Sequence, residues 1–158
     1  MSNIIVSGTF DRLHEGHKYL LHQCIDRFVD YEYNHLLVEI TPNTYVQKFK
    51  KLASIVQSEK ERLQGVENYL SHIICDGQYT VVISNDEYGS AMYSKNLDTV
   101  VVGKDTEAWA LMINFYRVQS GLNPLTIIIS EDYIKNGKRI SSTSLREKEF
   151  IHGELGFI

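Results

Sequence analysis

Short apolar runs alternate with longer segments of helical periodicity along this 158-residue chain. The apolar runs are continuous rather than alternating in polarity, which is typical of parallel strands covered by helices on both faces. The strands are expected at residues 3–7, 36–40, 81–83, 99–102 and 125–129, and the main helices at 14–31, 58–73 and 105–120. The sequence therefore predicts one α/β domain over residues 1–158, a Rossmann-like, open, parallel five-stranded sheet.

The expected helix boundaries are marked by residue types that are common at the first or last turn of a helix. Ser58 followed by Glu61 has the spacing of a capping box. Gly121 is a natural stop for the helix before it, and Pro124 prevents that helix from continuing. The apolar spacing places Trp109, Met112, Ile113 and Tyr116 on the buried face of this helix, and a last short helix is expected to open at Ser141-Ser142-Thr143.

Composition excludes several classes of function. Sixteen basic and twenty acidic residues give a net charge of −4, which argues against a nucleic-acid binder with a broad positive field. The longest apolar run, residues 108–113, is far too short to span a membrane. Two cysteines cannot form a disulfide framework or a zinc cage, so we expect a reducing compartment, the cytoplasm.

The first expected strand leads into Gly8-Thr9-Phe10-Asp11-Arg12-Leu13-His14-Glu15-Gly16-His17. A glycine turn here leads into the N-terminus of a helix, where main-chain N–H groups and the helix dipole attract anions. His14 and His17 are three residues apart and share one side of the first turn. Two alternatives remain: a capped helix with solvated histidines, or a metal pair completed by Asp11 or Glu15.

A second segment of the same character follows the fifth expected strand. Asn136-Gly137 is a tight-turn dipeptide, and Ser141-Ser142-Thr143 is either a simple helix cap or a second anion site flanked by Lys138, Arg139 and Arg146. One anion site near the start of the fold and another near its end suit a nucleoside triphosphate that lies across the sheet edge.

The motif G-T-F-D-x-x-H-x-G-H at residues 8–17, with I-S-S-T-x-x-R at residues 140–146, resembles the H-x-G-H nucleotidylyltransferase superfamily. Within it, the run from Ile113 to Leu125 is similar to phosphopantetheine adenylyltransferases of the eukaryotic and archaeal type. Ser7 and Gly103-Lys104 depart from the usual pattern of that family, and the segment 41–56 matches it poorly.

The resemblance implies that ATP and 4′-phosphopantetheine react to give dephospho-coenzyme A and pyrophosphate, a step of coenzyme A biosynthesis. The acceptor phosphate attacks the α-phosphorus in line, so catalysis is alignment and charge stabilisation without a covalent intermediate. Mg²⁺ is expected to accompany ATP, held mainly by phosphate oxygens and water rather than by a protein metal site. The resemblance also favours a monomer, although no residue pattern excludes a dimer.

The resemblance assigns roles to individual residues. His17 is the expected catalytic donor to the α-phosphate, and His14 is expected to hold the triphosphate. The residues expected to bind ATP are Gly8, Thr9, Phe10, His14, Gly16, His17, Gly103, Lys104, Ile140, Ser141, Ser142, Thr143 and Arg146.

Lys48 is a further expected catalytic residue, in contact with the acceptor phosphate. Thr9 and Arg62 are also expected to bind this phosphate. Lys50 and Lys51 are alternatives to Lys48, and a solvated charge run is the plainer interpretation of all three lysines. For Arg62 the plainer interpretation is an exposed arginine on an amphipathic helix.

Other functions fit the same fold. A cytidylyltransferase for a small phospho-alcohol would carry a different run before the isoleucine and serines than Asn136-Gly137-Lys138-Arg139. A non-catalytic sensor of a nucleotide or of coenzyme A would tolerate loss of the two motif histidines, and both are present. A bifunctional synthase would need a phosphate-loop kinase domain, which this sequence lacks.

Overall fold

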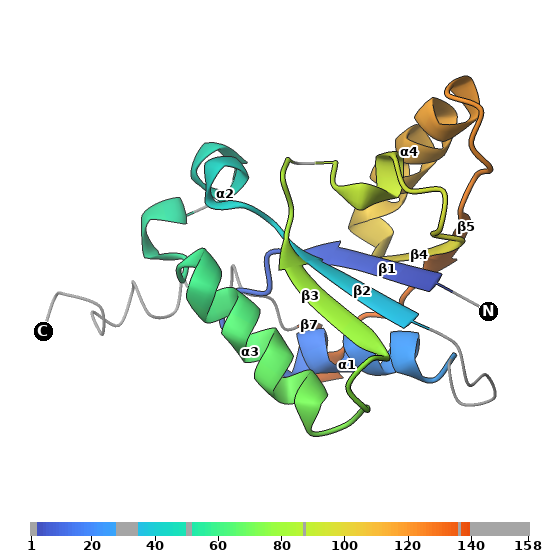
Figure 1. Cartoon of the computed structure of the whole chain (residues 1–158). Helices are drawn as coiled ribbons and strands as arrows, with labels where there is room; N and C mark the ends of the chain where they lie inside the picture. The colour runs from blue at the N-terminus through green and yellow to red at the C-terminus, as the bar shows by residue number, and fades with distance from the viewer. Residues whose placement is uncertain (1–2, 28–34, 50–51, 87, 136, 140–158) are drawn as a thin grey trace, which may run out of the picture.

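Five strands form one parallel sheet in the order β3-β2-β1-β4-β5 (Figure 1). The computed structural model describes residues 3–27, 35–49, 52–86, 88–135 and 137–139. The strands are β1 (Asn3–Gly8), β2 (His35–Ile40), β3 (Tyr79–Ile83), β4 (Thr99–Val102) and β5 (Thr126–Ile129). Because the chain runs outward from β1 to β3 and then returns to β4, the strand order reverses between β1 and β4. The predicted α/β fold with a parallel five-stranded sheet is confirmed.

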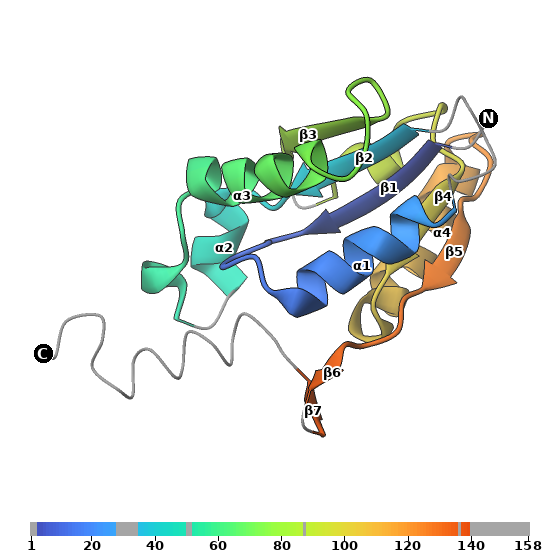
Figure 2. The ribbon, with the colours of Figure 1, turned by 90° about the horizontal axis from the view of Figure 1, so that it is seen from below.

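Helices cover both faces of the sheet. They are α1 (Glu15–Ile25), α2 (Asn43–Phe49), α3 (Glu59–Ser71) and α4 (Glu107–Gln119), with the 3₁₀ turns η1 (Ala53–Ile55), η2 (Ser90–Met92) and η3 (Lys104–Thr106). Figure 2 shows α1 and α3 side by side on one face, with α4 on the other. No helix in the described ranges combines the length and apolar character needed to cross a bilayer.

The central strand supplies both halves of the core. Ile4 and Val6 of β1 pack in a cluster with Leu21 of α1 and with Val66 of α3. Ile5 points the other way, into a cluster with Ile113 of α4. This alternation follows from strand geometry, since successive side chains point to opposite faces of a sheet. A continuous apolar run in β1 is therefore needed to bury both of its faces.

The expected helix ends are mostly confirmed. Ser58 and Glu61 form the reciprocal capping box at the start of α3. Gly121 adopts a positive φ of 82° after α4, where a residue with a side chain would be strained. The expected extent of the first helix to residue 31 is wrong, because α1 ends at Ile25 with Asp26 as its C-cap.

The buried face of α4 differs from the sequence pattern at one position. Ala110, Ile113 and Arg117 are buried, whereas Tyr116 is 46% exposed. The Arg117 guanidinium takes the inward place because it donates to the main-chain carbonyl oxygens of Ala91, Ser94 and Asn123. A charged residue is thus accommodated on a face that apolar periodicity alone would give to an aromatic residue.

A small hairpin follows the sheet. Strands β6 (Ile134–Lys135) and β7 (Lys138–Arg139) pair in antiparallel register, and Gly137 between them has a φ of 76°. The pairing of Lys135 with Lys138 and the positive φ of Gly137 agree with the tight turn predicted here, of which Asn136 lies outside the described residues. The helix expected at Ser141–Thr143 lies outside the described residues.

Candidate active site

The loop between β1 and α1 lies where the strand order reverses. Ser7, Gly8 and Thr9 at the end of β1 line a cavity of about 150 Å³ together with Thr41, Tyr45, Val102, Thr106 and Trp109. The cavity therefore collects residues that follow β1, β2 and β4. Open parallel sheets bind ligands at this kind of crevice, beyond the carboxyl ends of the strands.

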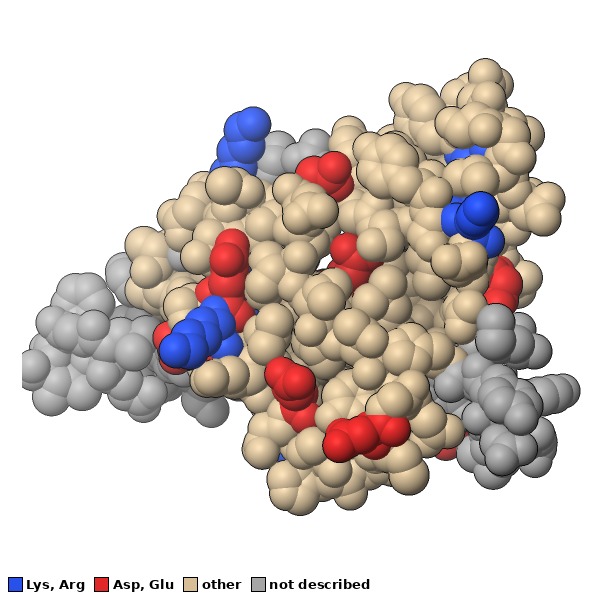
Figure 3. Space-filling view, viewed as in Figure 1, with Lys and Arg blue, Asp and Glu red and all other residues tan. Residues whose placement is uncertain are grey.

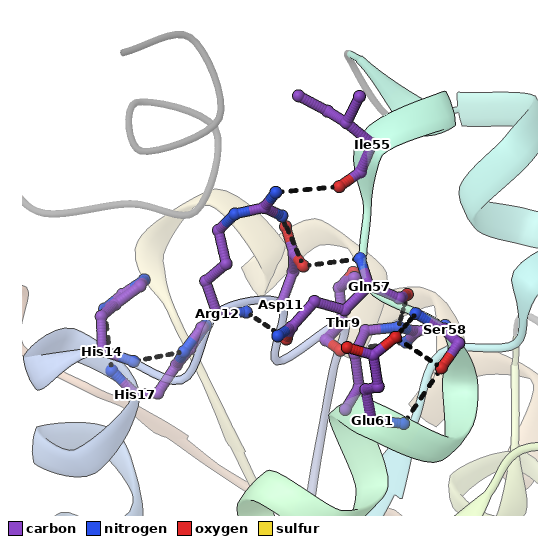
Figure 4. Close-up of polar contacts among 10 residues, drawn as sticks. Thr9, Asp11, Arg12, His14, His17, Ile55, Gln57, Ser58 and Glu61 are labelled. Atoms are coloured by element: carbon purple, nitrogen blue, oxygen red, sulfur yellow. Dashed lines mark hydrogen bonds and ion pairs between the residues drawn. The ribbon is translucent and has the colours of Figure 1, made fainter. Parts of the chain in front are cut away.

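His14 and His17 cap the first turn of α1 for each other. The Nδ1 atom of His14 accepts from the main-chain N–H of Gly16 at 3.0 Å and of His17 at 3.4 Å. The Nδ1 atom of His17 accepts in return from the N–H of His14 at 3.2 Å (Figure 4). The two rings stack with centroids 3.8 Å apart and planes 20° from parallel.

These bonds fix where each neutral ring carries its proton. A nitrogen that accepts from an N–H has no proton of its own, so the proton of each ring must sit on Nε2. His14 and His17 thus both carry an N–H donor on the nitrogen that the cap does not use. Such a pair is suited to donate hydrogen bonds to phosphate oxygens, and not to act as a base through Nδ1.

Burial keeps His17 neutral. Desolvation, and then the neighbouring His14, lower the pKa of His17 from 6.5 to about 3, while Asp11 opposes this shift. In the unfolded chain the same ring takes a proton as the pH falls below 6.5. Between pH 6.5 and 3 the unfolded state therefore binds more protons than the folded one, and stability falls as the pH falls.

We expect the free energy of unfolding to be highest above pH 6.5 and to decrease toward pH 4, with at most about 1.4 kcal/mol per pH unit from this residue. Urea unfolding at pH 7, 6 and 5 measures it. His17→Gln should flatten the decrease, because Gln does not titrate and can still accept from the cap N–H. The same change at the exposed His72 is the control. Equal slopes for the two variants would contradict the assignment.

The loop before the histidines is held in an unusual main-chain conformation. Phe10 and Arg12 have φ values of 53° and 51°, which residues with side chains rarely adopt. A Cβ at Gly8 would lie 3.1 Å from the Phe10 ring, so the close return of the chain favours glycine there. Phe10 itself is buried and its ring lies 5.2 Å from that of His17.

Thr9 carries a buried hydroxyl with unused hydrogen-bonding capacity. Its Oγ1 is buried and has no hydrogen-bond partner among the described residues. Buried hydroxyls are normally satisfied, so an orphan at the edge of a cavity points to a group supplied from outside the chain. Contact of the Thr9 hydroxyl with a phosphate stays a prediction.

Asp11 has a structural role in the loop. Its carboxylate is fully buried and accepts from Arg12 Nη1 at 2.9 and 2.7 Å and from the N–H of Gln57 at 2.9 Å (Figure 4). Arg12 also donates to the Ile55 carbonyl oxygen. The described residues contain no group of three or more His, Cys, Asp or Glu side chains that could hold a metal. A metal pair at His14 and His17 therefore has no supporting third ligand in the described part of the chain.

Arg62 connects the loops around the site through its guanidinium, an arrangement called the Arg62 clamp below. Its side chain is 1% exposed, so the interpretation as an exposed helix arginine is wrong. Its guanidinium donates to the carbonyl oxygens of Thr9, Thr41 and Gln57 and to Asn43 Oδ1, at 2.7–3.0 Å. Sequence reasoning missed this clamp, although Arg62 falls in register with the buried Val66 and Leu70, four and eight residues later. Contact of Arg62 with an acceptor stays a prediction.

The other expected residues are partly described. Gly16 donates to His14, Gly103 precedes η3 beside the end of β4, and Lys104 and Lys48 are exposed. Lys48 lies on α2, a helix that the sequence did not predict. Expected ligands that lie outside the described residues are Lys50, Lys51, Ile140, Ser141, Ser142, Thr143 and Arg146.

Comparison with known proteins points to one group. Residues 5–148 match the cytidylyltransferase-like family. The phosphopantetheine adenylyltransferase of Methanopyrus kandleri is 30% identical over 144 residues, which covers 90% of this chain and 87% of that protein. That of Pyrobaculum aerophilum is 31% identical over 148 residues, covering 91% and 89%. A solved structure of a protein of unknown function from Archaeoglobus fulgidus has a TM-score of 0.69 at 24% identity, covering 89% and 96%, and shows likeness of fold alone.

Proposed function

The chain belongs to the cytidylyltransferase-like family, with phosphopantetheine adenylyltransferases among its relatives, and on that basis we propose that it transfers the adenylyl group of ATP to 4′-phosphopantetheine. The products are dephospho-coenzyme A and pyrophosphate, so the enzyme acts in coenzyme A biosynthesis. The observation that carries this proposal is the likeness to adenylyltransferases over most of both chains. We place the activity in the cytoplasm, which the free thiols of Cys24 and Cys75 favour.

The acceptor is already a nucleophile in this reaction. One of its phosphate oxygens bonds to the α-phosphorus of ATP, and the bond from that phosphorus to the bridging oxygen of the β-phosphate breaks. Pyrophosphate leaves with the electron pair of that bond. The enzyme needs neither a base to activate the acceptor nor a covalent intermediate, so its task is to align two anions and to stabilise the charge that gathers on the α-phosphate.

The histidine pair meets this need. In the proposal His17 donates through Nε2–H to the α-phosphate oxygens, and His14 donates to the triphosphate. A low pKa at His17 leaves this donor in one protonation state across the neutral range. The orphan Thr9 hydroxyl orients the incoming phosphate.

The remaining contacts of the proposal come from the resemblance. Gly103 and Lys104 lie near the adenosine, and Lys48 meets the acceptor phosphate. The segment Ile140–Thr143 and Arg146 hold the β- and γ-phosphates. Mg²⁺ enters as part of the ATP complex, held by phosphate oxygens and water.

The test is pyrophosphate release with Mg²⁺ present, with ATP or CTP crossed against 4′-phosphopantetheine or glycerol 3-phosphate. We expect release only with ATP and 4′-phosphopantetheine. Release with CTP would retain the family and overturn the substrates. If all four pairs are silent, titration of ATP separates an enzyme with another acceptor, which binds ATP, from a protein that does not use the nucleotide.

A further inference from the structure

Three cavities adjoin along the carboxyl edge of the sheet, and their described lining residues include neither His14 nor His17. The cavity at Thr9 shares Ser7 and Thr41 with a narrow one of about 20 Å³. That narrow cavity shares Glu39, Asp86 and Gly89 with a third cavity of about 240 Å³. Together they form a trough, here called the acidic trough, that runs from the proposed reaction centre past the ends of β1 and β2 to the loop after β3.

Glu39 lies between the second and third cavities. It is the next-to-last residue of β2, and only 3% of it is exposed. One hydrogen bond reaches its carboxylate from the described residues, from the main-chain N–H of Ser90 to Oε1 at 2.7 Å. Buried carboxylates normally accept several bonds or pair with a cation. Oε2 of Glu39 therefore retains capacity for a donor that a bound molecule would bring.

The loop after β3 is fitted closely around this carboxylate. Gly89 has a φ of 65°, and a Cβ there would lie 2.8 Å from Glu39 Oε2. Asp86 Oδ1 fixes the same turn by accepting from the N–H groups of Tyr88 and Gly89. Glycine is thus the residue that lets the main chain lie against the carboxylate. Glu39 is a fixed part of the cavity wall, not a mobile surface side chain.

The second and third cavities of the acidic trough are lined by charges of one sign, which is negative. The described residues that line its second and third cavities include two carboxylates, Glu39 and Asp86, and no lysine or arginine. Figure 3 shows acidic atoms beside a hollow near the centre of this face, with no basic atoms next to them. An anionic group placed there would be repelled at close range in a partly desolvated site. Amide N–H, hydroxyl and thiol groups would instead find acceptors.

We infer that Glu39 determines acceptor specificity, by accepting a hydrogen bond from an uncharged arm of the acceptor and by rejecting an arm that carries a second negative charge. This inference rests on the proposed function. In 4′-phosphopantetheine the arm beyond the phosphate offers a hydroxyl, two amide N–H groups and a neutral thiol. 4′-Phosphopantothenate has the same phosphate end, but its arm ends in a carboxylate.

Glu39→Gln tests this with little change of shape. The Gln carbonyl oxygen can still accept from Ser90 N–H, so the loop keeps its anchor, and thermal unfolding verifies that the variant folds. We expect the ratio of kcat/KM for 4′-phosphopantetheine over 4′-phosphopantothenate to fall about 10-fold or more, with the KM for ATP unchanged. Glu67→Gln, which removes the same charge from an exposed site on α3, should leave the ratio as it is.

A binding experiment separates failure of this inference from failure of the proposed function. Trp109 is the one tryptophan of the chain and lines the cavity at Thr9. Its fluorescence is titrated with pantetheine and with pantothenate, which differ in the charge of the arm and need no turnover. We expect tighter binding of pantetheine, and a smaller difference in Glu39→Gln.

The outcomes are distinct. If the wild-type protein releases no pyrophosphate but shows this fluorescence pattern, the proposed reaction fails and the inference about the acidic trough stands. If Glu39→Gln leaves both the kinetic and the binding ratios unchanged, Glu39 only anchors Ser90 and the inference is wrong. Absence of any fluorescence change with either arm in the wild-type protein also overturns it.

Discussion

Replacing His17 by alanine is expected to lower kcat about 10²–10³-fold, which is the usual cost of one lost hydrogen-bond donor to a developing oxyanion. The KM for ATP should change by only a few fold, because the lost contact strengthens as the α-phosphate gathers charge. Single-turnover rates of pyrophosphate release measure the chemical step directly. Near-normal turnover in His17→Ala would contradict the role of the Nε2–H donor.

The same substitution also removes a helix cap, and the two effects must be separated. Nδ1 of His17 accepts from His14 N–H, so His17→Ala should cost about 0.5–2 kcal/mol of unfolding free energy. His17→Gln is the matched control, because Gln at this position of a capping box can accept from the same N–H. We expect it to restore most of the stability but little of the rate. Recovery of both would mean that His17 acts through the cap alone.

The parts of the fold that could be predicted from sequence are those encoded by local pattern. The β4 strand at 99–102 and the capping box at Ser58 need only neighbouring residues to specify them, and both were found where expected. The motif histidines belong to this class too, since a three-residue spacing on a helix start already places them together. Strand β1 was recognisable because a strand buried on both faces must be apolar throughout.

The parts that could not be predicted depend on contacts distant in sequence. Arg62 and Arg117 are charged, yet both are about 1% exposed. Their burial is possible only because loop carbonyl groups from elsewhere in the chain converge on each guanidinium. Glu39 is a similar case, since a glutamate inside an apolar strand has no local signal of the loop that closes over it. The α2 helix is an exception, because a local signal is present: Tyr45, Val46 and Phe49 have the three- and four-residue spacing of one helix face.

The Arg62 clamp leads to the second large effect. Arg62→Met keeps much of the side-chain volume but leaves the carbonyl oxygens of Thr9, Thr41 and Gln57 without their donor. Each unsatisfied buried group costs about 1–3 kcal/mol, and water at the cavity edge can replace part of this, so we expect a loss of about 3 kcal/mol. Because Thr9 is in the proposed phosphate site, the KM for ATP should also rise, by about 10-fold. Urea unfolding and steady-state kinetics well below the melting temperature measure the two effects.

Arg117→Met distinguishes a positioning role at the site from a general loss of stability. Arg117 is buried to the same extent and also donates to three carbonyl oxygens, but these belong to Ala91, Ser94 and Asn123, on the α4 side of the sheet. We expect a similar decrease in unfolding free energy with the KM for ATP unchanged. If both variants raise this KM equally, the effect of Arg62 on ATP is a consequence of lost stability. If only Arg62→Met raises it, the guanidinium positions the loop that holds Thr9, and the clamp links the ends of β1 and β2 to nucleotide binding.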